Sequence, residues 1–134
     1  MRRRLALAAL PLLALAACQQ PAPAQAPQPV PASVVFFNAD SAALDDQAHD
    51  VILQAAAAAK RRPDQPVRVR GFAAPDAGTG AFNKALATAR AQQVADHLAE
   101  AGVNRGRIRI EPRGAVPYDS FPTESRRVEI VIGG

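Results

Sequence analysis

One arginine lies on a predicted helix where apolar side chains are expected. The segment over about residues 81–101 has apolar residues at helical spacing and stops at Gly102. At about 100° per residue, with Leu86 at zero, Val94 falls near 80° and Arg90 near 40°, on the apolar side. The sequence leaves three interpretations open: a side chain that snorkels at the edge of the core, a structural pair with a carboxylate, or a two-pronged receptor for an anionic ligand.

The chain's single cysteine, Cys18, follows a short apolar segment near the N-terminus. Three arginines precede an apolar run over residues 5–17. A bilayer-spanning helix needs about 20 apolar residues, so this run fits a removable signal segment. Two other interpretations remain: a secretory signal cut near residues 14–16, which leaves a free thiol, and a segment retained as a membrane anchor.

The run Leu15-Ala16-Ala17-Cys18 resembles the lipobox of bacterial lipoproteins at every position. The resemblance implies cleavage just before Cys18 and attachment of lipid to that residue. In Gram-negative lipoproteins an aspartate after the cysteine favours inner-membrane retention, and this chain has Gln19 there. We therefore expect residues 1–17 to be a lipoprotein signal peptide, with the protein lipid-anchored at the periplasmic face of the outer membrane.

The net charge argues against a nucleic-acid partner. The full chain has 16 basic and 12 acidic residues, and loss of Arg2, Arg3 and Arg4 with the signal leaves 13 against 12. A nucleic-acid binder carries a large basic excess on one surface. With Cys18 lipidated, no thiol remains for a disulfide or a redox reaction.

Residues 18–33 are predicted to be a tether that begins at the lipidated cysteine. They contain five prolines among alanine and glutamine, a composition that cannot bury a core and favours an extended polyproline II chain. At ~3.1 Å per residue, the 15 residues that follow Cys18 reach about 45 Å.

Residues 34–134 are expected to form a single domain. Strands are predicted at 34–37, 67–70, 107–111 and 127–132. A first helix, capped by Asp40 or Ser41, should end before Pro63, and a second should cover about 81–101. Because three strands alternate charged and apolar residues, one sheet face is solvated and both helices cover the other. The fold class is α+β, a two-layer β-α-β-α-β-β sandwich with a mixed sheet and two helices on one face.

This domain resembles the C-terminal peptidoglycan-binding domain of OmpA and Pal proteins. The resemblance rests on an ordered set of motifs: Phe37…Asp40-Ser41…Leu44, Val67-Arg68-Val69-Arg70-Gly71-Phe72, Asn83…Leu86…Arg90-Ala91, Gly102…Arg107-Ile108, Gly114 and Ser125-Arg126-Arg127-Val128-Glu129-Ile130. A lipobox, a tether and this domain together form the Pal layout.

The resemblance implies a site for the diaminopimelate of the wall peptide. In the family an aspartate takes the ammonium group and the helix arginine, here Arg90, takes the carboxylate. Asp40 and Asn83 are expected to shape the pocket. The family aspartate falls at Ala74 when counted from Gly71, so the nearest carboxylate, Asp76, is the candidate ammonium partner.

Two departures from the family pattern leave a second function open. The aspartate is displaced in this loop, and Ser125 replaces the usual asparagine before Arg126, to which we assign a structural role. The first hypothesis is an outer-membrane lipoprotein that binds peptidoglycan non-covalently and tethers membrane to wall. The alternative is a degenerate OmpA-like domain that acts as a protein–protein interaction module on envelope proteins.

The sequence offers no constellation for an enzyme. The two histidines, His49 and His97, have no metal-like spacing and are expected at the surface or edge of their helices. No nucleophile is paired with a base. We expect no metal, no cofactor and no catalytic activity.

Overall fold

The computed structural model describes residues 22–24 and 29–134. The elements follow in the predicted order, β-α-β-α-β-β. They are β1 (Ser33–Phe36), α1 (Asp46–Lys60), β2 (Val67–Ala73), α2 (Gly80–Glu100), β3 (Ile108–Ala115) and β4 (Arg127–Ile132). The predicted signal peptide and Cys18 lie outside the described residues.

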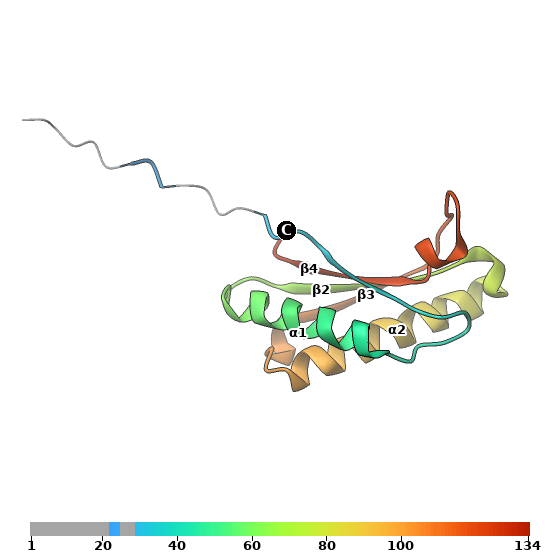
Figure 1. The fold of residues 1–134 in the computed structure, drawn as a ribbon, viewed down its shortest axis with the longest axis horizontal. Coiled ribbons are helices and arrows are strands. Elements are labelled where there is room, and N and C mark those ends of the chain that lie inside the picture. The colour runs from blue at the N-terminus through green and yellow to red at the C-terminus, as the bar shows by residue number, and fades with distance from the viewer. Residues whose placement is uncertain (1–21, 25–28) are drawn as a thin grey trace, which may run out of the picture.

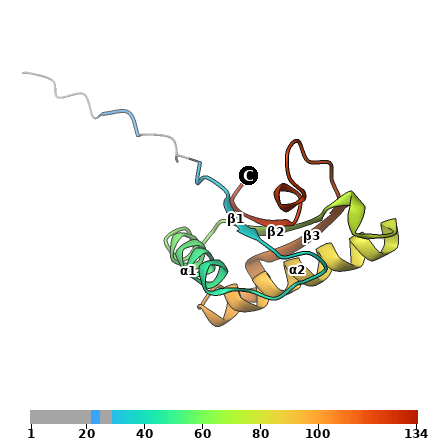
Figure 2. The same ribbon diagram turned by 45° about the vertical axis from the view of Figure 1, so that its right-hand side comes forward.

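The four strands form one mixed sheet in the order β1-β4-β2-β3. β4 pairs antiparallel with both β1 and β2, whereas β2 and β3 are parallel. Both α-helices lie on one side of the sheet, and the other side carries the β3–β4 loop with a short 3-10 turn at one end and, among the described residues, no α-helix (Figures 1 and 2). The predicted two-layer α+β fold is confirmed.

The core lies between the sheet and the two helices. β4 shows the expected alternation, with Val128, Ile130 and Ile132 buried and the residues between them partly exposed. Ile52 from α1 and Leu98 from α2 pack against this layer and are almost fully buried. Each such side chain contributes roughly 1.5–3 kcal/mol through burial.

Helix α1 begins later than predicted. Its N-cap is Asp45, whose carboxylate accepts a hydrogen bond from the Ala48 amide at 2.7 Å. The predicted cap residues belong instead to a turn, in which Asp40 adopts a left-handed backbone with φ of 51°. Ser41 Oγ accepts a hydrogen bond from the Ala43 amide. Which residue caps a helix depends on the local backbone conformation, and the residue types alone did not predict that conformation.

Strand β3 is longer than predicted, because it continues through Pro112 and Gly114, which the sequence assigned to turns. Pro112 is tolerated because β3 is an edge strand and pairs only with β2. Opposite it, β2 is irregular between Gly71 and Phe72 and extends to Ala73. This extension carries β2 to the loop that holds Asp76.

The β2–α2 contact is close at Gly71. A Cβ at this position would overlap the carbonyl oxygen of Ala87 and crowd the side chain of Ala91. A glycine therefore lets α2 approach the sheet, and that approach sets the position of Arg90 on the next turn of the helix. Within the described ranges, no helix has both the length and the apolar character to cross a bilayer.

Candidate functional site

Arg90 is fully buried between α2 and the sheet, with no solvent exposure. Its guanidinium donates three hydrogen bonds to backbone carbonyls. Nε bonds Ser41 at 2.8 Å, Nη1 bonds Phe72 at 3.1 Å, and Nη2 bonds Asn38 at 3.0 Å. One side chain thus ties the β1–α1 loop to the end of β2.

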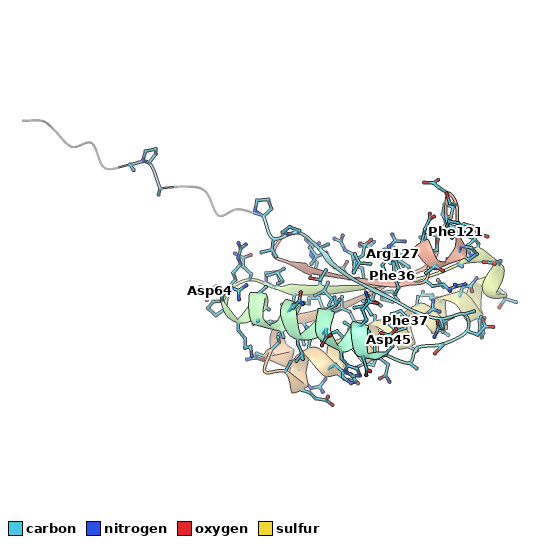
Figure 3. The ribbon with its side chains drawn as sticks, viewed as in Figure 1. Phe36, Phe37, Asp45, Asp64, Phe121 and Arg127 are labelled. Atoms are coloured by element: carbon cyan, nitrogen blue, oxygen red, sulfur yellow. The ribbon has the colours of Figure 1, made fainter. Side chains whose placement is uncertain are left out.

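An aromatic ring completes the surroundings of Arg90. The guanidinium carbon lies 5.3 Å from the centroid of the Phe37 ring, within the range of a cation–π contact. Phe37 is itself buried, on the opposite side of the chain from the exposed Phe36 (Figure 3). The sequence left three interpretations of Arg90 open, and in this structure its hydrogen-bond partners are backbone carbonyls rather than a carboxylate.

Burial lowers the pKa of Arg90 to about 10, because a charged guanidinium loses hydration in the interior. The positive charge of Arg126 contributes to this lowered pKa, and the negative charge of Asp40 opposes the shift. Arg90 remains a cation at neutral pH. Its charge lies close enough to Arg126 and Asp40 to interact with both.

A hollow of about 140 Å³ lies at this end of the sheet, where the β1–α1 and β2–α2 loops meet. It is lined by Ala39, Asp40, Ala74, Asp76 and Arg126. Two carboxylates and one guanidinium therefore share a small surface. This charge set complements a zwitterion, because carboxylates bind an ammonium group and a guanidinium binds a carboxylate.

The two predicted acidic residues, Asp40 and Asp76, come together from separate loops. Asp76 lies in a short 3-10 turn over Pro75–Ala77 and is exposed. Asp40 is also exposed, and its left-handed turn places it on the same hollow. Asp76 of the β2–α2 loop therefore lines the same hollow as Asp40.

Asn83 does not line this hollow. It is buried in the first turns of α2, where Nδ2 donates to the Gly78 carbonyl at 3.4 Å. Its Oδ1 has no hydrogen-bond partner among the described residues. Asn83 therefore contacts the loop that carries Asp76 at Gly78 and is not among the residues that line the hollow.

Arg126 has a position that the sequence interpretation did not predict, beyond the structural role assigned to it. Its Nε donates to the Phe37 carbonyl at 3.3 Å and its Nη2 to Thr123 Oγ1 at 2.8 Å, which agrees with the structural role assigned to it. It also lines the hollow beside Asp40 and Asp76. The only signal in the sequence was its place in the Ser125-Arg126-Arg127 motif.

The two histidines meet across the helix interface. The ring centroids of His49 in α1 and His97 in α2 are 4.8 Å apart in an edge-on arrangement. The sequence placed them separately and did not predict this contact. In the described part of the chain, no three histidine, cysteine or acidic side chains cluster so that they could hold a metal ion.

The comparisons with known proteins agree with this fold. The sequence model of the OmpA family matches residues 36–128, more than half of the chain. The chain belongs to the OmpA family. Outer membrane protein 40 of Porphyromonas gingivalis is 34% identical over 98 residues, which cover 73% of this chain. The match spans only 26% of that longer protein.

Two solved structures show the same architecture. The peptidoglycan-associated lipoprotein of Burkholderia pseudomallei superimposes with a TM-score of 0.68 at 25% identity, covering 75% of this chain and 89% of the other. The C-terminal domain of Helicobacter pylori MotB gives a TM-score of 0.68 at 26% identity, covering 78% of this chain and 85% of the other. The described domain therefore has the fold that the resemblance implied.

Proposed function

We propose that this protein is an outer-membrane lipoprotein that binds peptidoglycan non-covalently and tethers the membrane to the wall. The hollow that combines Asp40, Asp76 and Arg126 carries the proposal, because its charges match the zwitterionic end of diaminopimelate. The name of the Burkholderia relative, a peptidoglycan-associated lipoprotein, supports the same activity.

Asp76 is proposed to bind the ammonium group of the ligand, with Asp40 as its neighbour in the hollow. The direct role proposed for Arg90, as receptor of the ligand carboxylate, stays a prediction. Its guanidinium is covered in this structure, so direct contact requires the Ser41 and Asn38 carbonyls to move. Arg126 already faces the hollow and is proposed as the first contact of that carboxylate.

Retention on purified peptidoglycan tests the site. Asp76→Asn and Arg126→Gln should each bind several-fold less than the wild type, because each removes one charge that faces the zwitterion. Asp64→Asn is the matched control, since Asp64 is exposed in the turn after α1, at the far end of the molecule (Figure 3). Equal retention of all four proteins would overturn the site assignment.

A direct role of Arg90 in binding has to be tested with variants that distinguish an effect on folding from an effect on binding. Arg90→Lys keeps the charge but loses the planar fork, so a folded Arg90→Lys protein with normal retention would exclude a direct two-pronged bond. If the wild type itself is not retained but crosslinks specifically to an envelope protein, the domain is instead an interaction module. The covered guanidinium is the observation that favours this second candidate.

The lipid anchor is a separate proposal, because Cys18 lies outside the described residues. Incorporation of labelled fatty acid into the wild type, and its loss in Cys18→Ser, would support the anchor. The wild-type protein should fractionate with outer membranes. Unlabelled wild-type protein would overturn lipidation without affecting the wall site.

A further inference from the structure

The side of the sheet that the helices leave open is rich in arginine. Strand register places Arg68 opposite Arg109, and Arg70 opposite both Glu111 and Glu129. Alternation along β4 adds Arg127 to this open sheet face, and the ion pair with Glu111 places Arg113 there beside the irregularity of β3. The basic residues of the open sheet face are therefore Arg68, Arg70, Arg109, Arg113 and Arg127. Its acidic residues are Glu111 and Glu129.

The two glutamates neutralise only part of this charge. Glu111 lies 3.2 Å from Arg70 and 2.9 Å from Arg113, and Glu129 lies 2.9 Å from Arg127. Arg109 is exposed and has no ion pair among the described residues. Five guanidiniums against two carboxylates give the strand residues of this face a net positive charge.

The net positive charge of the open sheet face is larger than that of the whole processed chain, which has 13 basic and 12 acidic residues once Arg2 to Arg4 are removed. The rest of the domain must therefore be slightly acidic. Charge of one sign gathered on one face creates a field that attracts an extended anionic surface.

Two exposed aromatic side chains accompany the arginines. Phe36 is 52% exposed at the edge strand β1, where it pairs with Arg127 in register. Phe121 is 68% exposed in the β3–β4 loop, which rises on the same side of the sheet (Figure 3). Basic residues beside exposed aromatic rings are typical of surfaces that lie on the headgroup region of a membrane.

We propose that the open sheet face docks on an anionic phospholipid leaflet. The proposal rests on the proposed lipid anchor, since the tether predicted from the sequence, with a reach of about 45 Å, would keep the domain close to a bilayer. The tether enters the domain at Ser33, the first residue of β1 and thus the edge of this same sheet. The arginines bind lipid phosphates, and Phe36 and Phe121 enter the headgroup layer.

Vesicle co-sedimentation tests the docking with the full chain carrying Cys18→Ser, so that no lipid can be attached. The protein should bind vesicles of phosphatidylcholine with phosphatidylglycerol and bind phosphatidylcholine alone much more weakly. Arg109→Gln/Arg113→Gln should reduce the partition onto anionic vesicles by about tenfold, because each basic residue near such a surface strengthens binding several-fold. Added salt should remove most of the preference of the protein for anionic vesicles, because it screens the charges.

Arg61→Gln/Arg105→Gln is the matched control. It removes the same charge from exposed positions at the end of α1 and after α2, off the sheet face. All variants keep residues 1–17, so any contribution of that apolar segment is common to them. Equal binding by both double variants, or no preference of the wild type for anionic vesicles, would overturn the proposal.

Retention on peptidoglycan separates this inference from the proposed function. Arg109→Gln/Arg113→Gln should bind the wall like the wild type, since neither residue lines the hollow. If the wild type binds anionic vesicles but is not retained on peptidoglycan, the result counts against the wall site alone. If the wild type is retained on peptidoglycan but does not bind anionic vesicles, the result counts against the docking alone.

Discussion

Arg90 Nη2 donates to the backbone carbonyl of Asn38 over 3.0 Å, joining residues that are 52 positions apart in the sequence. With its bonds to Ser41 and Phe72, this guanidinium holds the loops around the hollow. The residue that sequence analysis singled out for ligand binding is therefore also the residue that organises the proposed site.

Arg90→Ala is expected to destabilise the domain by roughly 2–4 kcal/mol. The change leaves three carbonyls without a donor and opens a cavity in a buried region. Urea unfolding gives the free energy of unfolding for comparison. Arg105→Ala is the control, because its ion pair with Asp96 is at the surface and should contribute little to stability. Similar stability losses in the two variants would contradict the structural role.

Gly71→Ala is expected to destabilise the domain by about 1–3 kcal/mol or more. The added methyl group would overlap the Ala87 carbonyl oxygen, so α2 must shift away from the sheet. Gly80→Ala is the control, since nothing lies near a Cβ at the first residue of α2. Thermal unfolding should show a lower Tm for Gly71→Ala alone. A Tm near that of the wild type would disprove the close approach.

Asp45→Ala is expected to lower stability by about 1 kcal/mol, because the Ala48 amide loses its capping acceptor. Asp46→Ala should cost only a few tenths of a kcal/mol, as Asp46 interacts mainly with the helix dipole. Urea unfolding of both variants makes the comparison. A larger loss of stability in Asp46→Ala than in Asp45→Ala would contradict the observed start of α1.

The β3–β4 loop should loosen in acid. Glu124 accepts hydrogen bonds from the backbone amides of Asp119, Phe121 and Ser120, and these bonds lower its pKa below 4.5. Because the folded-state pKa is lowered, the stabilisation is complete above about pH 4.5. It is lost as the pH falls through the lower folded-state value.

Amide hydrogen exchange measured against pH checks the loop. Protection of the Ser120 and Phe121 amides should fall as Glu124 is protonated, and Glu124→Ala should lose that protection at neutral pH. Glu100→Ala, which removes an exposed carboxylate from the end of α2, should leave it unchanged. Protection that does not depend on pH in the wild type would contradict the role of Glu124.

The fold was largely predictable because its signals are local. Charged and apolar residues alternate in β2 and β4, and the helices end where Pro63 and Gly102 follow. Element boundaries were less accurate. Capping by Asp45 and the extension of β3 through Pro112 depend on backbone geometry and on strand position, which local patterns do not encode.

The sequence by itself determined the order of elements, the open and covered faces of the sheet, and the unusual place of Arg90 on an apolar helix face. Only the tertiary structure decided that Arg90 bonds three carbonyls, that Arg126 joins Asp40 and Asp76 at the hollow, and that five arginines gather on one side. Periodicity assigns a residue to a face of its own element. Its partners depend on strand register and loop conformation between segments that are distant in the chain.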